Sequence, residues 1–130
     1  MWTKLFVFLC LITVASARTK WEVRAEGRVL CDGSPANATV SLKEIDPLQD
    51  DLLQQTTTDD HGRYFLHGEE TEYTQIRPYL VVEHHCDGKY ERVRHDIPSY
   101  FVYAQEHEGH PIFVKHFSFN RTTQPTTRLP

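Results

Sequence analysis

Apolar and polar residues alternate along much of the chain, which predicts β-strands rather than helices. Between Trp21 and Cys31, small or apolar residues at odd positions alternate with residues that are charged at the even positions up to Arg28. A period of two is typical of a strand that buries one face. Residues 32–35 (Asp-Gly-Ser-Pro) have turn chemistry, and the same alternation then predicts a second strand over residues 38–43.

Residues 76–86 form the clearest predicted strand, and the Asp87-Gly88 pair that follows predicts a hairpin. A two-residue turn at this position fixes the register of the two strands. Leu80 then faces His95, Val82 faces Val93, His84 faces Glu91 and Cys86 faces Lys89. This register keeps the apolar residues on one face, whereas a slip of one residue would move them to the other face.

The rest of the chain predicts shorter elements. We expect a loop with room for one helical turn at 46–55, a strand at 63–67 that ends at Gly68, a short helix or loop at 69–75, a last strand at 112–119 and a disordered tail at 121–130. Seven or eight short strands without a long helix predict an all-β fold, an antiparallel β-sandwich.

The N-terminus has the pattern of a secretory signal peptide. Lys4 supplies a positive charge, residues 5–14 are almost wholly apolar, and Ala-Ser-Ala at 15–17 is a small-x-small cleavage site. The apolar run is about ten residues long, whereas a membrane-spanning helix needs roughly 20. We therefore predict a signal peptide over residues 1–17, cleavage after Ala17, and a secreted protein without a transmembrane anchor.

Removal of that segment changes both the size and the charge of the chain. The remaining 113 residues suit one domain, which we place at 18–120. Lys4 is lost, so 13 of the 14 basic side chains remain against 18 acidic ones, and the net charge becomes −5. A mildly acidic chain without a basic block does not have the electrostatic footprint of a nucleic-acid-binding protein.

Two cysteines remain after cleavage, because Cys10 leaves with the signal peptide. An even pair in an oxidising compartment predicts one disulfide, between Cys31 and Cys86. The alternative at this point is a pair of free, buried thiols.

Several motifs carry a family resemblance. They are Gly27–Ala36 followed by Val40-Ser41-Leu42, the glycine- and tyrosine-containing segment 58–68, the run Ile76–Cys86, and Ile97-Pro98-x-Tyr100. In order and spacing they resemble the nematode transthyretin-like family over residues 23–119.

The resemblance implies a secreted, transthyretin-like (prealbumin-like) sandwich. It does not imply thyroid hormone carriage, because the relation to transthyretin is distant, and it does not bring an enzyme activity. The related hydroxyisourate hydrolases use a His/Arg constellation and end in a Tyr-Arg-Gly-Ser-like motif, whereas this chain ends in Thr-Gln-Pro-Thr-Thr-Arg-Leu-Pro. Many family members carry a further cysteine shortly after the hairpin. This chain has none there, which leaves Cys31 and Cys86 as the one possible pair.

The sequence also offers candidate modification and metal sites. Asn37 and Asn120 begin glycosylation sequons. Among the eight histidines, His84 and His95 lie on one predicted face, with Glu91 opposite His84. We interpret them as a hydrogen-bonded cluster rather than a zinc site, which needs three or four converging ligands.

Acidic residues gather at 46–51 and 59–60, but without the Asp-x-Asp-x-Asp-Gly frame of a calcium loop. We interpret them as solvated surface, and we predict no metal and no cofactor.

These features favour a non-enzymatic binding module whose partner is an extracellular protein such as a receptor, a lipid headgroup or a small apolar ligand. The aromatic residues Tyr100, Phe101 and Tyr103 form its candidate binding surface, since aromatic side chains are enriched at interfaces. One alternative is a small hydrolase using His84, His95 and either Arg77 or Arg94, which requires these groups to line one open cleft. An extracellular structural protein is the other.

Overall fold

The alternation of small and charged residues in β1 (Thr19–Cys31) makes this long strand the centre of the larger sheet. The computed structural model describes residues 18–105 and 109–121. In it β5 (Arg63–Glu72) pairs antiparallel with β1 over ten residues, from Thr19 opposite Glu72 to Arg28 opposite Arg63. The short strands β2 (Ser34–Pro35), β8 (Tyr103–Ala104), β9 (Phe113–Val114) and β10 (Phe117–Phe119) complete this sheet. β9 and β10 run parallel to β1, and the other pairings are antiparallel.

The smaller sheet has the order β4 (Asp51–Thr57), β3 (Ala38–Glu44), β6 (Pro78–His84) and β7 (Glu91–Asp96). The hairpin of β6 and β7 has the predicted register, with Leu80 opposite His95, Val82 opposite Val93 and His84 opposite Glu91. Gly88 has a φ of +81°, the left-handed conformation that a tight hairpin turn requires. The predicted register is therefore confirmed, but the two-residue turn is not: the ladder ends at His84 and Glu91 without the predicted Cys86–Lys89 pair, and the Gly88 N–H donates to the His85 carbonyl at 3.0 Å.

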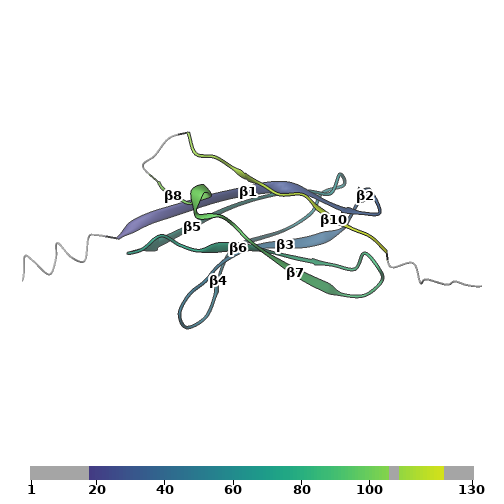
Figure 1. Ribbon diagram of the computed structural model, residues 1–130, viewed down its shortest axis with the longest axis horizontal. Helices are drawn as coiled ribbons and strands as arrows, with labels where there is room; N and C mark the ends of the chain where they lie inside the picture. Colours follow the sequence, from purple (N-terminus) through teal and green to yellow (C-terminus); the bar gives the residue numbers. More distant parts are fainter. Residues whose placement is uncertain (1–17, 106–108, 122–130) are drawn as a thin grey trace, which may run out of the picture.

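The two sheets pack face to face as a sandwich (Figure 1). The inward side chains of both sheets form the core. Its most deeply buried members are Val23, Ala25, Val29, Val40, Leu42, Leu66, Leu80 and Val82. The predicted all-β sandwich is confirmed, and it extends from Thr19 to Phe119.

Two predictions about the middle of the chain are wrong. Residues 51–55 belong to β4 rather than to a loop, and β5 continues through Gly68 to Glu72 in place of a helix or loop at 69–75. Both strands gain their hydrogen bonds from a neighbour, β3 in one case and β1 in the other, so local polarity did not decide their conformation. The predicted last strand is likewise divided into β9 and β10.

Gly68 lies inside β5 rather than at its end. The absence of a side chain at this position lets the two sheets approach each other. A Cβ at this position would lie 2.6 Å from Leu42 Cδ2 and 2.9 Å from Leu53 Cδ1. The residue therefore sits inside a strand at a point of close packing between the two sheets.

The predicted disulfide is present, with Cys31 and Cys86 bonded and their Cα atoms 5.6 Å apart. It joins the end of β1 in the larger sheet to the turn after β6 in the smaller sheet. The predicted signal peptide (1–17) and residues 122–130 of the predicted tail lie outside the described residues. Within the described part of the chain, no helix is long and apolar enough to cross a membrane.

Candidate binding surface

A short 3₁₀ helix follows β7 and carries two of the three predicted interface aromatics. Pro98 precedes this helix, η1 (Ser99–Phe101), and accepts a hydrogen bond from the Phe101 N–H at 3.1 Å. The Gln75 side chain holds the turn from outside, since its Nε2 donates to the Ser99 carbonyl at 3.2 Å and to the Val102 carbonyl at 3.0 Å. The turn therefore has a fixed position at this end of the sandwich.

The rings of this turn form a ladder that runs from solvent to the core. Tyr100 is 75% exposed and contacts Phe101 edge-on, with ring centroids 5.2 Å apart. Phe101 is half-buried and packs in the same manner on the buried Phe113, at 5.1 Å. An exposed aromatic ring on such a rigid support has little conformational entropy to lose on binding.

Tyr103 does not belong to this exposed surface, which corrects its assignment from the sequence. The residue is only 8% exposed, and its ring stacks on His110 with centroids 3.4 Å apart. It pairs in β8 against β1, opposite Glu22, so it lies on the face of the larger sheet away from the core, where the His110 ring covers it. The exposed part of the predicted surface is therefore Tyr100, with Phe101 beneath it.

A polar groove of about 500 Å³ lies on the outer face of the smaller sheet. Its walls are polar or charged apart from Leu52 and Val81. Beside it the Arg94 guanidinium lies 3.9 Å above the ring of Tyr79, whose hydroxyl donates to Asp50 at 2.5 Å. This hydrogen bond, more than any other contact, holds the pKa of Asp50 below its usual value. The sequence analysis missed the groove, although the outward-facing charges of β7 could have indicated it.

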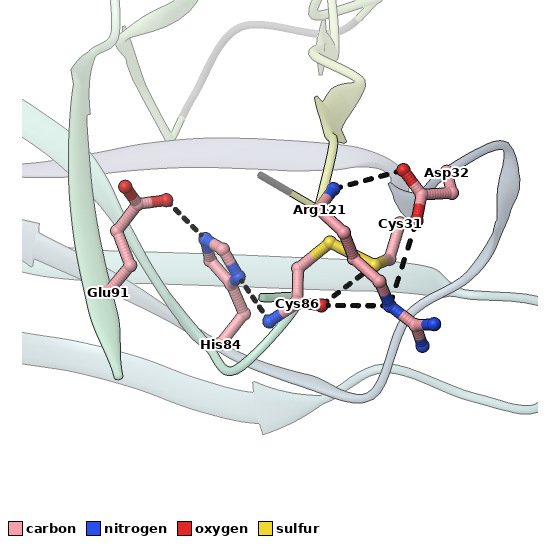
Figure 2. Close-up of a disulfide and its surroundings, with 6 residues drawn as sticks. All are labelled: Cys31, Asp32, His84, Cys86, Glu91 and Arg121. Carbon is pink, nitrogen blue, oxygen red and sulfur yellow. Dashed lines mark hydrogen bonds and ion pairs between the residues drawn. A yellow bond between two sulfur atoms is a disulfide. The ribbon is translucent and has the colours of Figure 1, made fainter. Parts of the chain in front are cut away.

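The histidine cluster at the disulfide end is a satisfied structural pair. His84 is buried, its Nε2 lies 2.8 Å from Glu91 Oε1, and its Nδ1 accepts the Cys86 N–H at 3.1 Å (Figure 2). Its ring also stacks on Phe119 with centroids 3.8 Å apart. Both ring nitrogens of His84 thus have partners, as predicted for its pair with Glu91, whereas His95 makes ring contacts with Phe113 and Phe117 and does not join the hydrogen-bonded pair. Among the described residues, no group of three potential metal ligands contains His84 or His95.

The C-terminal segment closes over the same end. Arg121 donates from Nε to the Cys86 carbonyl at 3.2 Å and from its backbone N–H to Asp32 at 3.0 Å (Figure 2). Asp32 has a φ of +51°, as the predicted turn at 32–35 requires.

The groups required for a hydrolase are not brought together. His95 packs against Phe113 and Phe117, and burial together with the charge of Lys115 keeps its pKa below the usual value. Arg94 lies on the opposite face of β7, over Tyr79. Arg77 precedes Pro78, at the far end of β6 from His84.

Both sequon asparagines are accessible. Asn37 and Asn120 are exposed in the turn before β3 and directly after β10. Their glycosylation remains a prediction.

Comparison with known proteins identifies the family. A family model described as the transthyretin-like family matches residues 26–98. The chain belongs to the transthyretin-like family. The resemblance drawn from the sequence motifs is therefore confirmed.

This transthyretin-like chain has relatives in Caenorhabditis elegans. It is 42% identical to Transthyretin-like protein 46 over 88 residues, which are 65% of this chain and 49% of that protein. It is 35% identical to Transthyretin-like protein 33 over 111 residues, which are 80% of this chain and 76% of that protein. The chain thus spans about half the length of the first relative and three quarters of the second.

Proposed function

We propose that this chain is a secreted, non-enzymatic binding module that recognises an extracellular protein through the turn that carries Tyr100. The observation that carries the proposal is the 75% exposure of Tyr100 above the Phe101–Phe113 ladder. Tyrosine is among the residue types that dominate the binding energy of protein interfaces. A large apolar ring held in solvent on a rigid support has no evident role in stabilising the fold itself.

A protein partner fits the surface better than a small apolar ligand. Pockets for small ligands are enclosed and predominantly apolar. The groove on the smaller sheet is instead polar and open, and Tyr100 stands exposed on the 3₁₀ turn before β8. A lipid headgroup is distinguished from a protein partner by the test below.

The absence of catalysis is part of the proposal and has its own support. The buried His84 uses both ring nitrogens within the fold, and Arg77 and Arg94 lie away from it. Secretion is supported by the signal-like pattern of residues 1–17 and by the disulfide, because disulfides persist in oxidising compartments.

The test compares three proteins at the surface of intact nematode cells: the mature wild type, Tyr100→Ala and Tyr90→Ala. Tyr90 is a matched control, since it is 56% exposed but lies at the opposite end of β7. We expect saturable binding of the wild type and of Tyr90→Ala. For Tyr100→Ala we expect a loss of affinity of about 30-fold, which is the effect typical of replacing a hot-spot residue by alanine.

Protease treatment of the cells beforehand should abolish the binding. Binding that survives protease and transfers to lipid vesicles would overturn the protein partner in favour of a lipid headgroup. Equal affinities for the wild type and Tyr100→Ala would overturn the assignment of the surface.

A further inference from the structure

Carboxylates from both sheets meet at one end of the sandwich. The inward positions of β3 read Ala38, Val40, Leu42 and then Glu44, so the apolar series ends in a glutamate. The inward positions of β5 likewise end in Glu70 and Glu72. Asp51 pairs directly with Glu44 across β3 and β4, and Asp46 lies in the loop between them. The interior that is apolar elsewhere is acidic at this end.

Glu44 is the centre of this cluster and lacks a partner. It is only 2% exposed, and its Oε1 is buried without any hydrogen bond. A buried carboxylate oxygen without a partner costs more free energy than almost any other polar group. Burial, followed by the charges of Glu70 and Glu72, raises the pKa of Glu44 to about 7.

The surrounding carboxylates do not relieve this cost, because they are acidic themselves. Ligand oxygens of Glu44, Asp46 and Asp51 lie within 4.8 Å of one another, and so do those of Glu44, Glu70 and Glu72. In the described part of the chain, none of the five forms a salt bridge to lysine or arginine. A bound cation is the partner that this arrangement lacks.

We propose a Ca²⁺ site between the two sheets in which Glu44, Glu70 and Glu72 are the ligands, while Asp46 and Asp51 lie beside Glu44 and add negative charge. Ca²⁺ takes six to eight oxygen ligands at about 2.3–2.6 Å, so two ligands on opposite sides of one ion lie up to about 5 Å apart. The separations within each triad fall inside this limit. Mg²⁺ demands a tighter octahedron, and zinc prefers nitrogen and sulfur ligands, so both fit this flexible all-oxygen set less well.

The site adjoins the turn that carries Tyr100. Gln75, whose side chain holds that turn, also lines a hollow of about 190 Å³ with Glu44, Asp46 and Glu72. A bound ion would therefore stiffen the segment that positions the candidate binding surface. The calcium site itself does not depend on the proposed function, and its test involves no partner.

The test is the thermal stability of the mature, disulfide-bonded protein in chelator-treated buffer as CaCl₂ is added. Extracellular calcium modules have dissociation constants of roughly 0.1–1 mM, so 10 mM CaCl₂ should raise Tm by about 5–10 °C in a saturable manner. MgCl₂ at equal concentration should give less than about half of this shift. Isothermal titration with CaCl₂ should give one ion per chain.

Glu44→Gln removes the central charge while keeping the size of the side chain. We expect this variant to lose the response to CaCl₂, and its Tm without calcium to equal or exceed that of the wild type, because a buried charge has been removed. Asp60→Asn is the matched control, since Asp60 is exposed beyond the start of β5, far along that strand from Glu70 and Glu72. It should retain the full shift.

If Glu44→Gln lacks the near-UV circular dichroism of a folded protein, Glu70→Gln replaces it and should lower the calcium affinity about tenfold or more. A wild type without a saturable shift, or a folded Glu44→Gln variant with an undiminished shift, would overturn the site.

Discussion

Replacing both disulfide cysteines, as Cys31→Ala/Cys86→Ala, is expected to lower the free energy of unfolding by about 4 kcal/mol. The bridge joins residues 55 positions apart and ties the larger sheet to the smaller one. Its closure removes many conformations from the unfolded chain, and the chain-entropy relation gives the quoted value for a loop of this length. Since small domains are stable by only about 5–15 kcal/mol, the loss is a large part of the total.

Urea denaturation of the oxidised wild type, the reduced wild type and the double variant measures this effect. The reduced protein and the variant should have nearly the same stability, because both lack the crosslink. A loss below about 1 kcal/mol in both would show that the bridge does not constrain the unfolded chain as the separation predicts.

Gly27→Ala is the second substitution with a large expected effect, a loss of about 3 kcal/mol. A Cβ at Gly27 would lie 1.9 Å from the carbonyl oxygen of Lys115. Two hydrogen bonds fix this contact, because the Tyr64 hydroxyl donates to the same oxygen at 2.6 Å and the Lys115 N–H donates to the backbone carbonyl of Glu26 at 3.0 Å. The alanine methyl group must therefore push the segment beside β9 away from β1.

Gly33→Ala is the matched control for this substitution. Gly33 has a φ of +81°, but a Cβ there would meet no atom within 4 Å. It should cost only the backbone strain of about 1 kcal/mol. Thermal or urea denaturation of both variants measures the difference, and equal losses would contradict the steric explanation for Gly27.

The sequence predicted those parts of the fold in which local pattern and pairing agree. The Asp87-Gly88 turn and the inward residues of β6 specify the same register, and the structure has it. The alternation from Val23 to Cys31 likewise predicted the buried face of β1. In both places a shift of one residue would expose apolar side chains, so the pattern alone decides the result.

The predictions made from the sequence were wrong where a strand distant in sequence decides the conformation. Gly68 looks like a strand end, yet β1 begins at Thr19 and supplies a partner for β5 as far as Glu72. The polar segment at 51–55 similarly becomes an edge strand because β3 lies beside it. Such pairings join residues far apart in sequence, and no local pattern reports them.

The same limit applies to the candidate sites. The sequence analysis considered the aspartates of the acidic loop as a possible calcium site but not Glu44, Glu70 and Glu72, which come from three separate positions in two strands. Only the extension of β5 brings its two glutamates opposite Glu44. Tyr103 was placed on the surface because an aromatic cluster in the sequence does not reveal which ring a later segment covers, here His110.

Photo-crosslinking from position 100 tests the proposed binding surface most directly. Tyr100 and, separately, Tyr90 are replaced by benzoylphenylalanine, and each mature protein is irradiated on intact nematode cells. Position 100 should yield an adduct of discrete mass that excess unlabelled wild type suppresses, and position 90 should yield none. An adduct of equal yield from position 90, or no suppressible adduct from position 100, would contradict the account.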